Sequence, residues 1–218
     1  EPCSRTAEVA ALRKGIVDDC RELATEGVEL VAALQEGLPR GAVLVSDLTV
    51  AAYWCRRLLE LYEPRCNIYP WGFCTLGFGL PAAIGAKLAC PERPVVCLSG
   101  DAGFLFNCQE LAVAAEAGLP VVVLLFNDSG YGALRPQQDH RFGRRHAVDA
   151  GNPDFVAVAR AFGVEARRVN EIGCLGPALA EALEAEAPAL IEVPVALPPQ
   201  IMEPGPRALF EAARGRTG

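Results

Sequence analysis

The sequence predicts an α/β fold, a three-layer arrangement in which a parallel β-sheet lies between helices on both of its faces. Segments of strand and helix character alternate along the 218 residues, and the strand segments are apolar on both faces. Three of these strand segments end in an aspartate, at Asp47, Asp101 and Asp128. Because ligands of such sheets bind beyond the carboxyl ends of the strands, the aspartates indicate where a site is expected.

The first part of the chain is expected to be helical. Apolar side chains recur at three- and four-residue steps in AEVAALRKGIVDDCREL and GVELVAALQEGL, which predicts two helices within residues 6–36. A short apolar run, AVLVSD (42–47), then ends in a polar turn and is typical of a buried strand. The next run, VAAYWCRRLLELY, returns to helical spacing.

The same alternation continues along the rest of the chain. Helices are expected in GFGLPAAIGAKLAC (77–90), NCQELAVAAEAGL, PDFVAVARAFG and GPALAEALEAEA, and strands in RPVVCLSGD, PVVVLLFND, EARRV and PALIEVPV. The charged stretch QQDHRFGRRHAVD is interpreted either as a mobile segment over the site or as solvated surface. Its two histidines, His140 and His146, are assigned no role.

Composition argues against several classes of protein. The net charge of −7 argues against a nucleic-acid surface, which needs a basic patch. The sequence has no apolar run long enough to span a membrane, and its N-terminus lacks the basic-then-apolar order of a signal peptide. The nine cysteines include no CxxC pair, so they predict reduced structural thiols in a cytoplasmic protein rather than disulfides or a zinc site.

The stretch PVVCLSGDAGFLFN (94–107) carries the main chemical signal. The small residues around Asp101 would let the backbone approach a bulky ligand and offer it N–H groups. The carboxylate would repel a phosphate unless a divalent cation lay between them, so the combination favours Mg²⁺ together with a diphosphate. Asn127-Asp128-Ser129-Gly130, at the end of the next apolar strand, supplies further oxygen ligands.

These residues resemble a known motif. The sequence GDA, followed by 24 residues and then ND, is similar to the thiamin-diphosphate motif, which is usually GDG followed by NN after a comparable interval. Upstream, GFCTLGFGLPAAIGAKLACPERPVVCLSGDAGF, and downstream, ELAVAAEAGLPVVVLLFNDSGYGALR, extend the resemblance over residues 40 to 195. The chain therefore resembles the C-terminal diphosphate-binding domain of acetolactate synthase-like and benzoylformate decarboxylase-like enzymes.

The resemblance implies a set of ligands. Asp101, Asp128 and the backbone carbonyl of Gly130 would bind Mg²⁺. Leu76 would lie under the cofactor and hold its two rings in a V shape, and the carbonyl of Cys74 would accept a hydrogen bond from the aminopyrimidine. The residues implied to contact thiamin diphosphate are Leu48, Thr49, Cys74, Leu76, Gly100, Ala102, Gly103, Tyr131 and Gly132.

Two positions depart from the family's pattern. Ala102 replaces the last glycine of GDG, which costs about 1 kcal/mol if the position needs a positive φ. Asp128 replaces a neutral asparagine, so the site holds two carboxylates. The second carboxylate should strengthen the attraction for Mg²⁺ and make binding of the diphosphate without metal unfavourable.

The resemblance also implies that other domains are needed. Residues 1–38 are interpreted as a helical lead-in from a middle domain, residues 39–196 as the thiamin-diphosphate-binding domain, and residues 197–218, rich in Pro, Gly and Arg, as a surface tail. Enzymes of the family carry their activating glutamate on a pyrimidine-binding domain, of which no part is found here, so no catalytic residue is assigned. The expected activity is that of a 2-oxo acid decarboxylase or carboligase, working as a homo-oligomer.

The sequence is compatible with other functions and other residue roles. The chain by itself could be a non-catalytic cofactor-binding domain or one subunit of a split enzyme. Asp128 could cap the following helix in an Asx turn, Leu76 could be ordinary core, and Asp47 is better explained as a helix cap than as a ligand. A nicotinamide-binding fold is disfavoured because no GxGxxG follows the first strand, and a phosphoacceptor domain would leave CTLGF unexplained.

Overall fold

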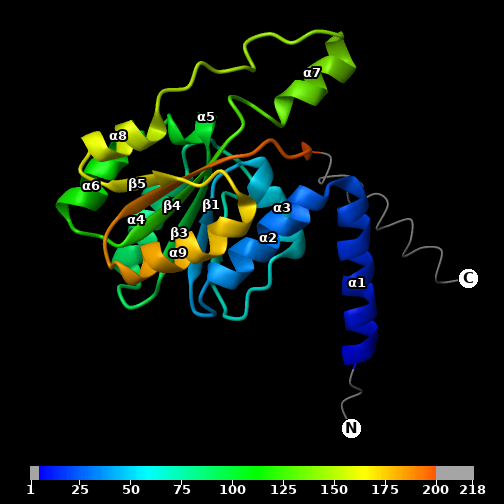
Figure 1. Cartoon of the computed structure of the whole chain (residues 1–218), viewed down its shortest axis with the longest axis horizontal. Helices are drawn as coiled ribbons and strands as arrows, with labels where there is room; N and C mark the ends of the chain where they lie inside the picture. The colour runs from blue at the N-terminus through cyan, green and yellow to red at the C-terminus, as the bar shows by residue number, and fades with distance from the viewer. Residues whose placement is uncertain (1–4, 200–218) are drawn as a thin grey trace, which may run out of the picture.

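The computed structural model of the chain describes residues 5–199. Within this range the strands form one six-stranded sheet in the order β2-β1-β3-β4-β6-β5, and every neighbouring pair is parallel. The sheet confirms the predicted fold class (Figure 1). Its strands are β1 (Val43–Ser46), β2 (Asn67–Ile68), β3 (Val95–Gly100), β4 (Val121–Asn127), β5 (Glu165–Arg168) and β6 (Ala189–Pro194).

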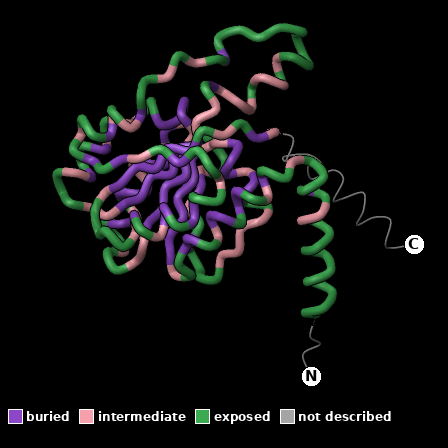
Figure 2. The backbone as a smooth tube through the Cα atoms, viewed as in Figure 1, coloured by how far each residue is buried: buried purple, intermediate pink, exposed green. Residues whose placement is uncertain are grey.

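Helices cover both faces of the sheet, as the apolar character of the strands predicts. One face packs against α2 (Thr25–Gly37), α3 (Val50–Leu58) and α9 (Leu175–Glu184). The other packs against α4 (Gly79–Ala89), α6 (Leu111–Glu116) and α8 (Phe155–Ala161). Successive residues of the central strands alternate between the two hydrophobic clusters, because side chains of a strand point to opposite faces. The purple interior of Figure 2 is this double core.

Several elements differ from the sequence expectations. β2 was not predicted, because its two residues, Asn67 and Ile68, pair only with β1 at the sheet edge. The charged stretch QQDHRFGRRHAVD (137–149) is expected to be a mobile segment or solvated surface, but its first residues belong to the helix α7 (Leu134–Phe142), which extends away from the body in Figure 1. The run from residue 107 to residue 119 is divided between a short 3₁₀ turn, Cys108–Glu110, and α6.

The two N-terminal helices behave differently. The helix α1 (Thr6–Leu23) projects from the body and is exposed along most of its length (Figures 1 and 2). The helix α2 instead packs into the core, where Gly27 lies directly under the ring of Trp54 and Gly37 lies against the backbone of Gly176. Side chains at these two glycine positions would displace the neighbouring helices, so their small size allows α2 to approach α3 and α9.

The last described residues also pack against the domain. Leu197 is buried, and the indole of Trp54 donates a hydrogen bond to the carbonyl of Pro198 at 3.3 Å. The first residues of the segment expected to be a surface tail therefore contribute to the fold, because Leu197 covers apolar side chains beyond the end of β6. The remainder of that segment, residues 200–218, lies outside the described residues, as do residues 1–4.

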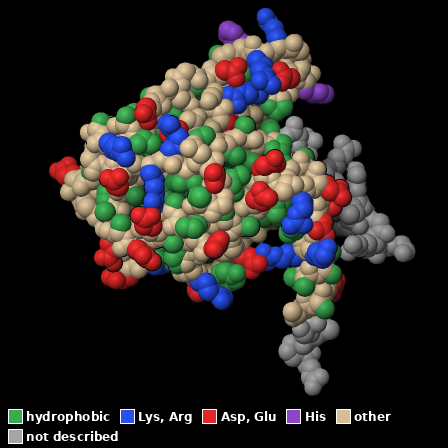
Figure 3. All heavy atoms as spheres, in the orientation of Figure 1, with side chains coloured by type: hydrophobic (Ala, Val, Ile, Leu, Met, Phe, Trp, Pro, Cys, Tyr) green, Lys and Arg blue, Asp and Glu red, His purple; other side chains and the backbone are tan. Residues whose placement is uncertain are grey.

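The general properties of the described part follow the composition. The eight cysteines within residues 5–199 form no disulfide. No helix in that range has the length and apolarity needed to cross a membrane. Acidic and basic side chains are interspersed over the face seen in Figure 3, as expected for a chain without a basic patch.

Candidate functional site

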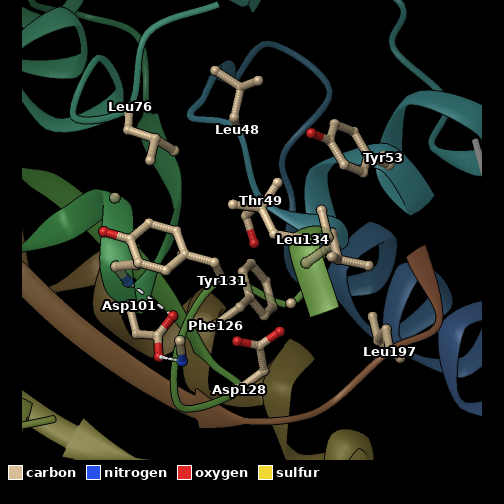
Figure 4. A pocket seen from close by; sticks show the side chains of 18 of the residues that line it. Leu48, Thr49, Tyr53, Leu76, Asp101, Phe126, Asp128, Tyr131, Leu134 and Leu197 are labelled. Atoms are coloured by element: carbon tan, nitrogen blue, oxygen red, sulfur yellow. Dashed lines mark hydrogen bonds between the residues drawn. The ribbon is translucent and has the colours of Figure 1, made fainter. Parts of the chain in front are cut away.

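The sheet topology brings the two aspartates of the motif together. β3 and β4 are parallel neighbours in which Gly100 pairs with Phe126, so Asp101 and Asp128 follow adjacent strand ends. A cavity of about 230 Å³ opens at this edge of the sheet. Both carboxylates lie at one end of it in Figure 4, and Leu48 and Leu76 lie at the other. The cavity thus has an acidic end and largely apolar walls.

Asp101 is held by three hydrogen-bond donors. The side chain is buried, and its Oδ1 accepts from the backbone N–H of Ala102 at 2.8 Å. Its Oδ2 accepts from the backbone N–H of Gly130 at 2.8 Å and from the side-chain amide of Asn152 at 2.5 Å. A buried carboxylate with this many donors has a fixed orientation, and its remaining lone pairs can bind a cation.

The turn after β4 depends on glycine. Ser129 and Gly130 have positive φ angles of 63° and 145°, which reverse the chain next to Asp101. A Cβ at Gly130 would overlap the carbonyl of Val148, and a Cβ at Gly132 would overlap the carboxylate of Asp128. The space that these two glycines leave open keeps the Asp128 side chain at the cavity.

Asp128 is balanced between attraction and repulsion. Arg135 donates to the carbonyls of Asp128 at 2.9 Å and Ser129 at 2.6 Å, and its guanidinium lies 3.6 Å from the Asp128 carboxylate. Burial and then the charge of Asp101 nevertheless raise the pKa of Asp128 to about 6, although Arg135 and the N–H of Gly130 act in the opposite direction. The positive charge of Arg135 is therefore too small to offset the burial of Asp128 and the repulsion between the two carboxylates. A divalent ion would supply the missing positive charge.

This balance predicts a pH-dependent stability. The raised pKa means that the folded chain keeps a proton on Asp128 up to about pH 6, whereas the unfolded chain loses it near the ordinary value of 3.8. Ionised Asp128 therefore destabilises the metal-free fold as pH rises through this window, by about 2–3 kcal/mol once ionisation is complete. We expect Asp128→Asn to be more stable than the unchanged chain by this amount at pH 7.5 in EDTA.

Urea unfolding at several pH values measures this effect. The difference between the two chains should shrink as pH falls and disappear below about pH 3, where Asp128 is protonated in both the folded and the unfolded state. A difference that is absent at pH 7.5, or that does not change with pH, would show that Asp128 is not strained by its surroundings.

The end of β1 positions the opposite side of the cavity. Asp47 is buried, and its carboxylate accepts from the backbone N–H groups of Leu48 at 2.7 Å, Gly77 at 3.0 Å and Gly79 at 3.2 Å. Burial raises its pKa and these three donors oppose the rise. Asp47 is thus a cap, as expected, but it caps α4, which packs on β1, rather than α3, which follows it in sequence. This contact fixes the loop that carries Leu76.

The small residues after β3 have a packing role that the sequence did not reveal. A Cβ at Gly100 would lie 3.2 Å from the side chain of Thr49, and one at Gly103 would lie 3.3 Å from the carboxylate of Asp47. The glycines therefore allow the ends of β1 and β3 to approach closely. Ala102 lies inside the short helix α5 (Asp101–Phe104) and has no positive φ, so the expected strain at this position does not arise.

The structure gathers the predicted site residues with one exception. Every residue assigned to thiamin diphosphate or Mg²⁺ lines the cavity apart from Cys74, which lies in an exposed loop with a φ of 55°. The N–H of Ala102, expected to serve a diphosphate, donates to Asp101 instead. Arg135 and Asn152 contact the acidic end but were given no role, although Arg135 falls within the quoted run GYGALR.

The acidic end suits a hard divalent cation that needs ligands from elsewhere. Two carboxylates and the carbonyl of Gly130 supply oxygen only, as Mg²⁺ prefers. Among residues 5–199, no cluster of three or more His, Cys, Asp or Glu side chains could hold a metal by itself. The residues present thus fit an ion whose coordination a phosphate group completes, and the apolar walls fit the rings of the same ligand.

Comparison with known proteins identifies the protein family to which the domain belongs. Residues 47–193 match the model of a family described as "Thiamine pyrophosphate enzyme, C-terminal TPP binding domain". The chain belongs to this family. It is a thiamine pyrophosphate-binding C-terminal domain of the acetolactate synthase and decarboxylase type, which confirms the resemblance seen in the sequence.

Individual relatives agree with this assignment. The chain is 38% identical to an acetolactate synthase of Bacillus subtilis, covering 77% of this chain and 30% of the relative. It is 37% identical to a probable 2-ketoarginine decarboxylase of Pseudomonas aeruginosa, covering 76% and 30%. In a thiamine diphosphate-dependent 4-hydroxybenzoylformate decarboxylase of Rhodococcus jostii, the matching fold has a TM-score of 0.72 at 34% identity, covering 77% of this chain and 32% of that one.

The match extends over only part of each relative. The chain spans about a third or less of the length of these relatives. The match to the family model, residues 47–193, includes Asp101, Asp128 and Gly130.

Proposed function

We propose that the chain binds thiamin diphosphate through a divalent cation, Mg²⁺, held by Asp101, Asp128 and the carbonyl of Gly130. The cation would join the two carboxylates to the diphosphate, which they would otherwise repel. Leu48, Leu76 and the other apolar walls would contact the rings. The observation that carries the proposal is the pair of carboxylates, Asp101 and Asp128, that lines one cavity at adjacent strand ends of a thiamine pyrophosphate-family domain. The raised pKa of Asp128 supports it.

We further propose that the domain serves a 2-oxo acid decarboxylase or carboligase, as in acetolactate synthase. When bound, the cofactor supplies an electron sink for loss of CO₂ from a 2-oxo acid. The residues of this chain would anchor and orient it, and Asp47 would hold Leu76 in place. Proton transfer to the cofactor would depend on a glutamate of a pyrimidine-binding domain, in the same or another chain, within a homo-oligomer. The free cysteines support a cytoplasmic location.

Calorimetry tests the binding proposal. We expect the chain to bind thiamin diphosphate with measurable heat in Mg²⁺ and at least about tenfold more weakly in EDTA, since the two carboxylates then repel the diphosphate. Equal binding in both conditions would contradict the proposed role of the metal. No binding in Mg²⁺ would contradict the proposed function of the isolated chain.

A second candidate is that the chain alone binds the cofactor without catalysing a reaction. The exposed loop around Cys74 favours this candidate, because the large apolar side chains of Trp71 and Phe73 are left largely uncovered by the described residues. Release of CO₂ from pyruvate or benzoylformate by the 218-residue chain would rule it out. We expect no release above the rate without protein.

A further inference from the structure

We propose that Asn152 is a positioning residue that holds the carboxylate of Asp101 in the orientation required by an ion of the size of Mg²⁺. The inference rests on the proposed function and assigns a role to a residue outside the motif. Asn152 donates one N–H to Oδ2 of Asp101 at 2.5 Å and the other to Oδ1 of Asn127 at 2.9 Å. Its side chain therefore joins the acidic ends of β3 and β4.

Chemistry fixes the direction of these hydrogen bonds. An ionised Asp101 can only accept, so Asn152 must present its NH₂ group to it. Asn127 must then present its oxygen to Asn152 and its own NH₂ to Oε1 of Glu192, which accepts at 2.8 Å. Asp101 and Glu192 stand at the two ends of this series of hydrogen bonds and can only accept. Each of the two amides between them therefore has a single orientation.

The last residue of this hydrogen-bond series, Glu192, is held in the sheet. Glu192 belongs to β6 and its side chain is only 2% exposed. Its Oε2 accepts from Nε of Arg168 on β5 at 2.8 Å, and Arg168 lies 3.6 Å from Asp154, which caps α8. Asn127 is therefore fixed by two strands, and Asn152 transmits that fixed position to Asp101.

Asn152 also holds its own segment against the turn of residues 129–131, which carries Gly130. Residues 148–150 lie antiparallel to residues 129–131, with hydrogen bonds of 2.8 Å from Tyr131 N–H to Val148 and from Ala150 N–H to Ser129. Asn152 follows directly after this pairing. The turn that carries Gly130 is thus enclosed between β4 and this segment.

The Oδ1 of Asn152 is left unpaired within residues 5–199 by the orientation in which the amide donates to Asp101. This oxygen is buried and has no hydrogen-bond partner among the described residues. An unpaired buried acceptor costs about 1–3 kcal/mol. Rotation of the amide would not relieve the cost, because Oδ1 would then face the oxygens of Asp101 and Asn127. Removal of Asn152 would relieve this cost but would also remove the donors to Asp101 and Asn127, so the stability of the metal-free fold does not report the positioning role.

The ratio of Mg²⁺ affinity to Ca²⁺ affinity measures the positioning role of Asn152. Mg²⁺ requires near-ideal octahedral geometry at about 2.1 Å, whereas Ca²⁺ accepts longer and less regular ligand distances. Loss of the partners that orient a ligand typically lowers metal affinity by about 10–100-fold. An Asp101 free to rotate should therefore lose Mg²⁺ affinity more than Ca²⁺ affinity, a difference that general loosening of the fold would not produce.

The experiment measures bound Mn²⁺ by electron paramagnetic resonance in the presence of thiamin diphosphate, with Mg²⁺ or Ca²⁺ as competitor. In Asn152→Ala we expect Mg²⁺ affinity to fall about tenfold or more and Ca²⁺ affinity by less than about threefold. The control is Gln35→Ala, since Gln35 also joins two segments, through Glu60 N–H at 2.7 Å and Glu60 carbonyl at 3.3 Å, far along the chain from Asp101. It should leave both affinities unchanged.

The outcomes separate this inference from the proposed function. An unchanged preference for Mg²⁺ over Ca²⁺ in Asn152→Ala would overturn the positioning role, whether or not both affinities fall. Absence of Mn²⁺ binding by the unchanged chain would instead overturn the proposed function. If Asn152→Ala does not fold, Asn152→Ser, whose shorter hydroxyl reaches only one acceptor, should show the same loss of preference.

Discussion

Asp101→Ala is expected to abolish Mg²⁺-dependent binding of thiamin diphosphate, with Kd rising about 100-fold or more. A charge-assisted contact contributes roughly 1.5–3 kcal/mol, so the loss of one ligand carboxylate reaches this range. The variant also leaves the N–H groups of Ala102, Gly130 and Asn152 without their acceptor, so the turn after β4 loses its anchor. Calorimetry in Mg²⁺ measures the change.

A matched control separates loss of a ligand from loss of negative charge. Asp149 is a carboxylate of the same region, largely exposed, that pairs with Arg135 at 2.7 Å. Asp149→Ala should change Kd by less than about threefold, because the Asp149 carboxylate is 67% exposed and solvent and salt screen its charge. Equal losses in the two variants would mean that Asp101 acts only through the charge of the region.

Gly130→Ala is expected to destabilise the metal-free chain by about 3 kcal/mol and to remove Mg²⁺ binding. A φ of 145° belongs to a region that is almost restricted to glycine, and a side chain there costs about 1–3 kcal/mol in strain alone. The new Cβ would also overlap the carbonyl of Val148 and so disrupt the pairing of residues 129–131 with residues 148–150. Urea unfolding in EDTA gives the change in stability.

Gly151→Ala is the matched control for this effect. Gly151 lies in the facing segment, its φ is not positive, and a Cβ there would meet no atom within 4 Å. It should unfold within about 0.5 kcal/mol of the unchanged chain, as surface substitutions usually do. A Gly130→Ala variant as stable as Gly151→Ala would contradict the account of the turn.

Much of the architecture could be predicted from local sequence. Strands such as Val121–Asn127 are almost purely apolar, and only a sheet covered on both faces buries such a run. Parallel pairing then places consecutive strand ends at one edge, so the proximity of Asp101 and Asp128 follows from the motif and the topology together. The comparisons with known proteins confirm the family to which that motif belongs.

Other features depend on the path of the chain between elements. Asp47 caps α4 instead of α3 because the chain returns at Gly77 and Gly79 to the end of β1. Asn152 reaches Asp101 because the segment after α7 returns to pair with the turn of residues 129–131, and nothing in the local sequence GNPDF specifies that return. The two residues of β2 and the exposed helix α7 carry too little apolar pattern to be recognised.

The most direct test of the central claim is a crystal structure of the chain with Mn²⁺ and thiamin diphosphate, with anomalous scattering used to locate the metal. We expect one anomalous peak within about 2.3 Å of carboxylate oxygens of both Asp101 and Asp128 and of the carbonyl of Gly130, with diphosphate oxygens completing its coordination. A bound diphosphate with the metal elsewhere, or with no metal beside Asp101 and Asp128, would contradict it.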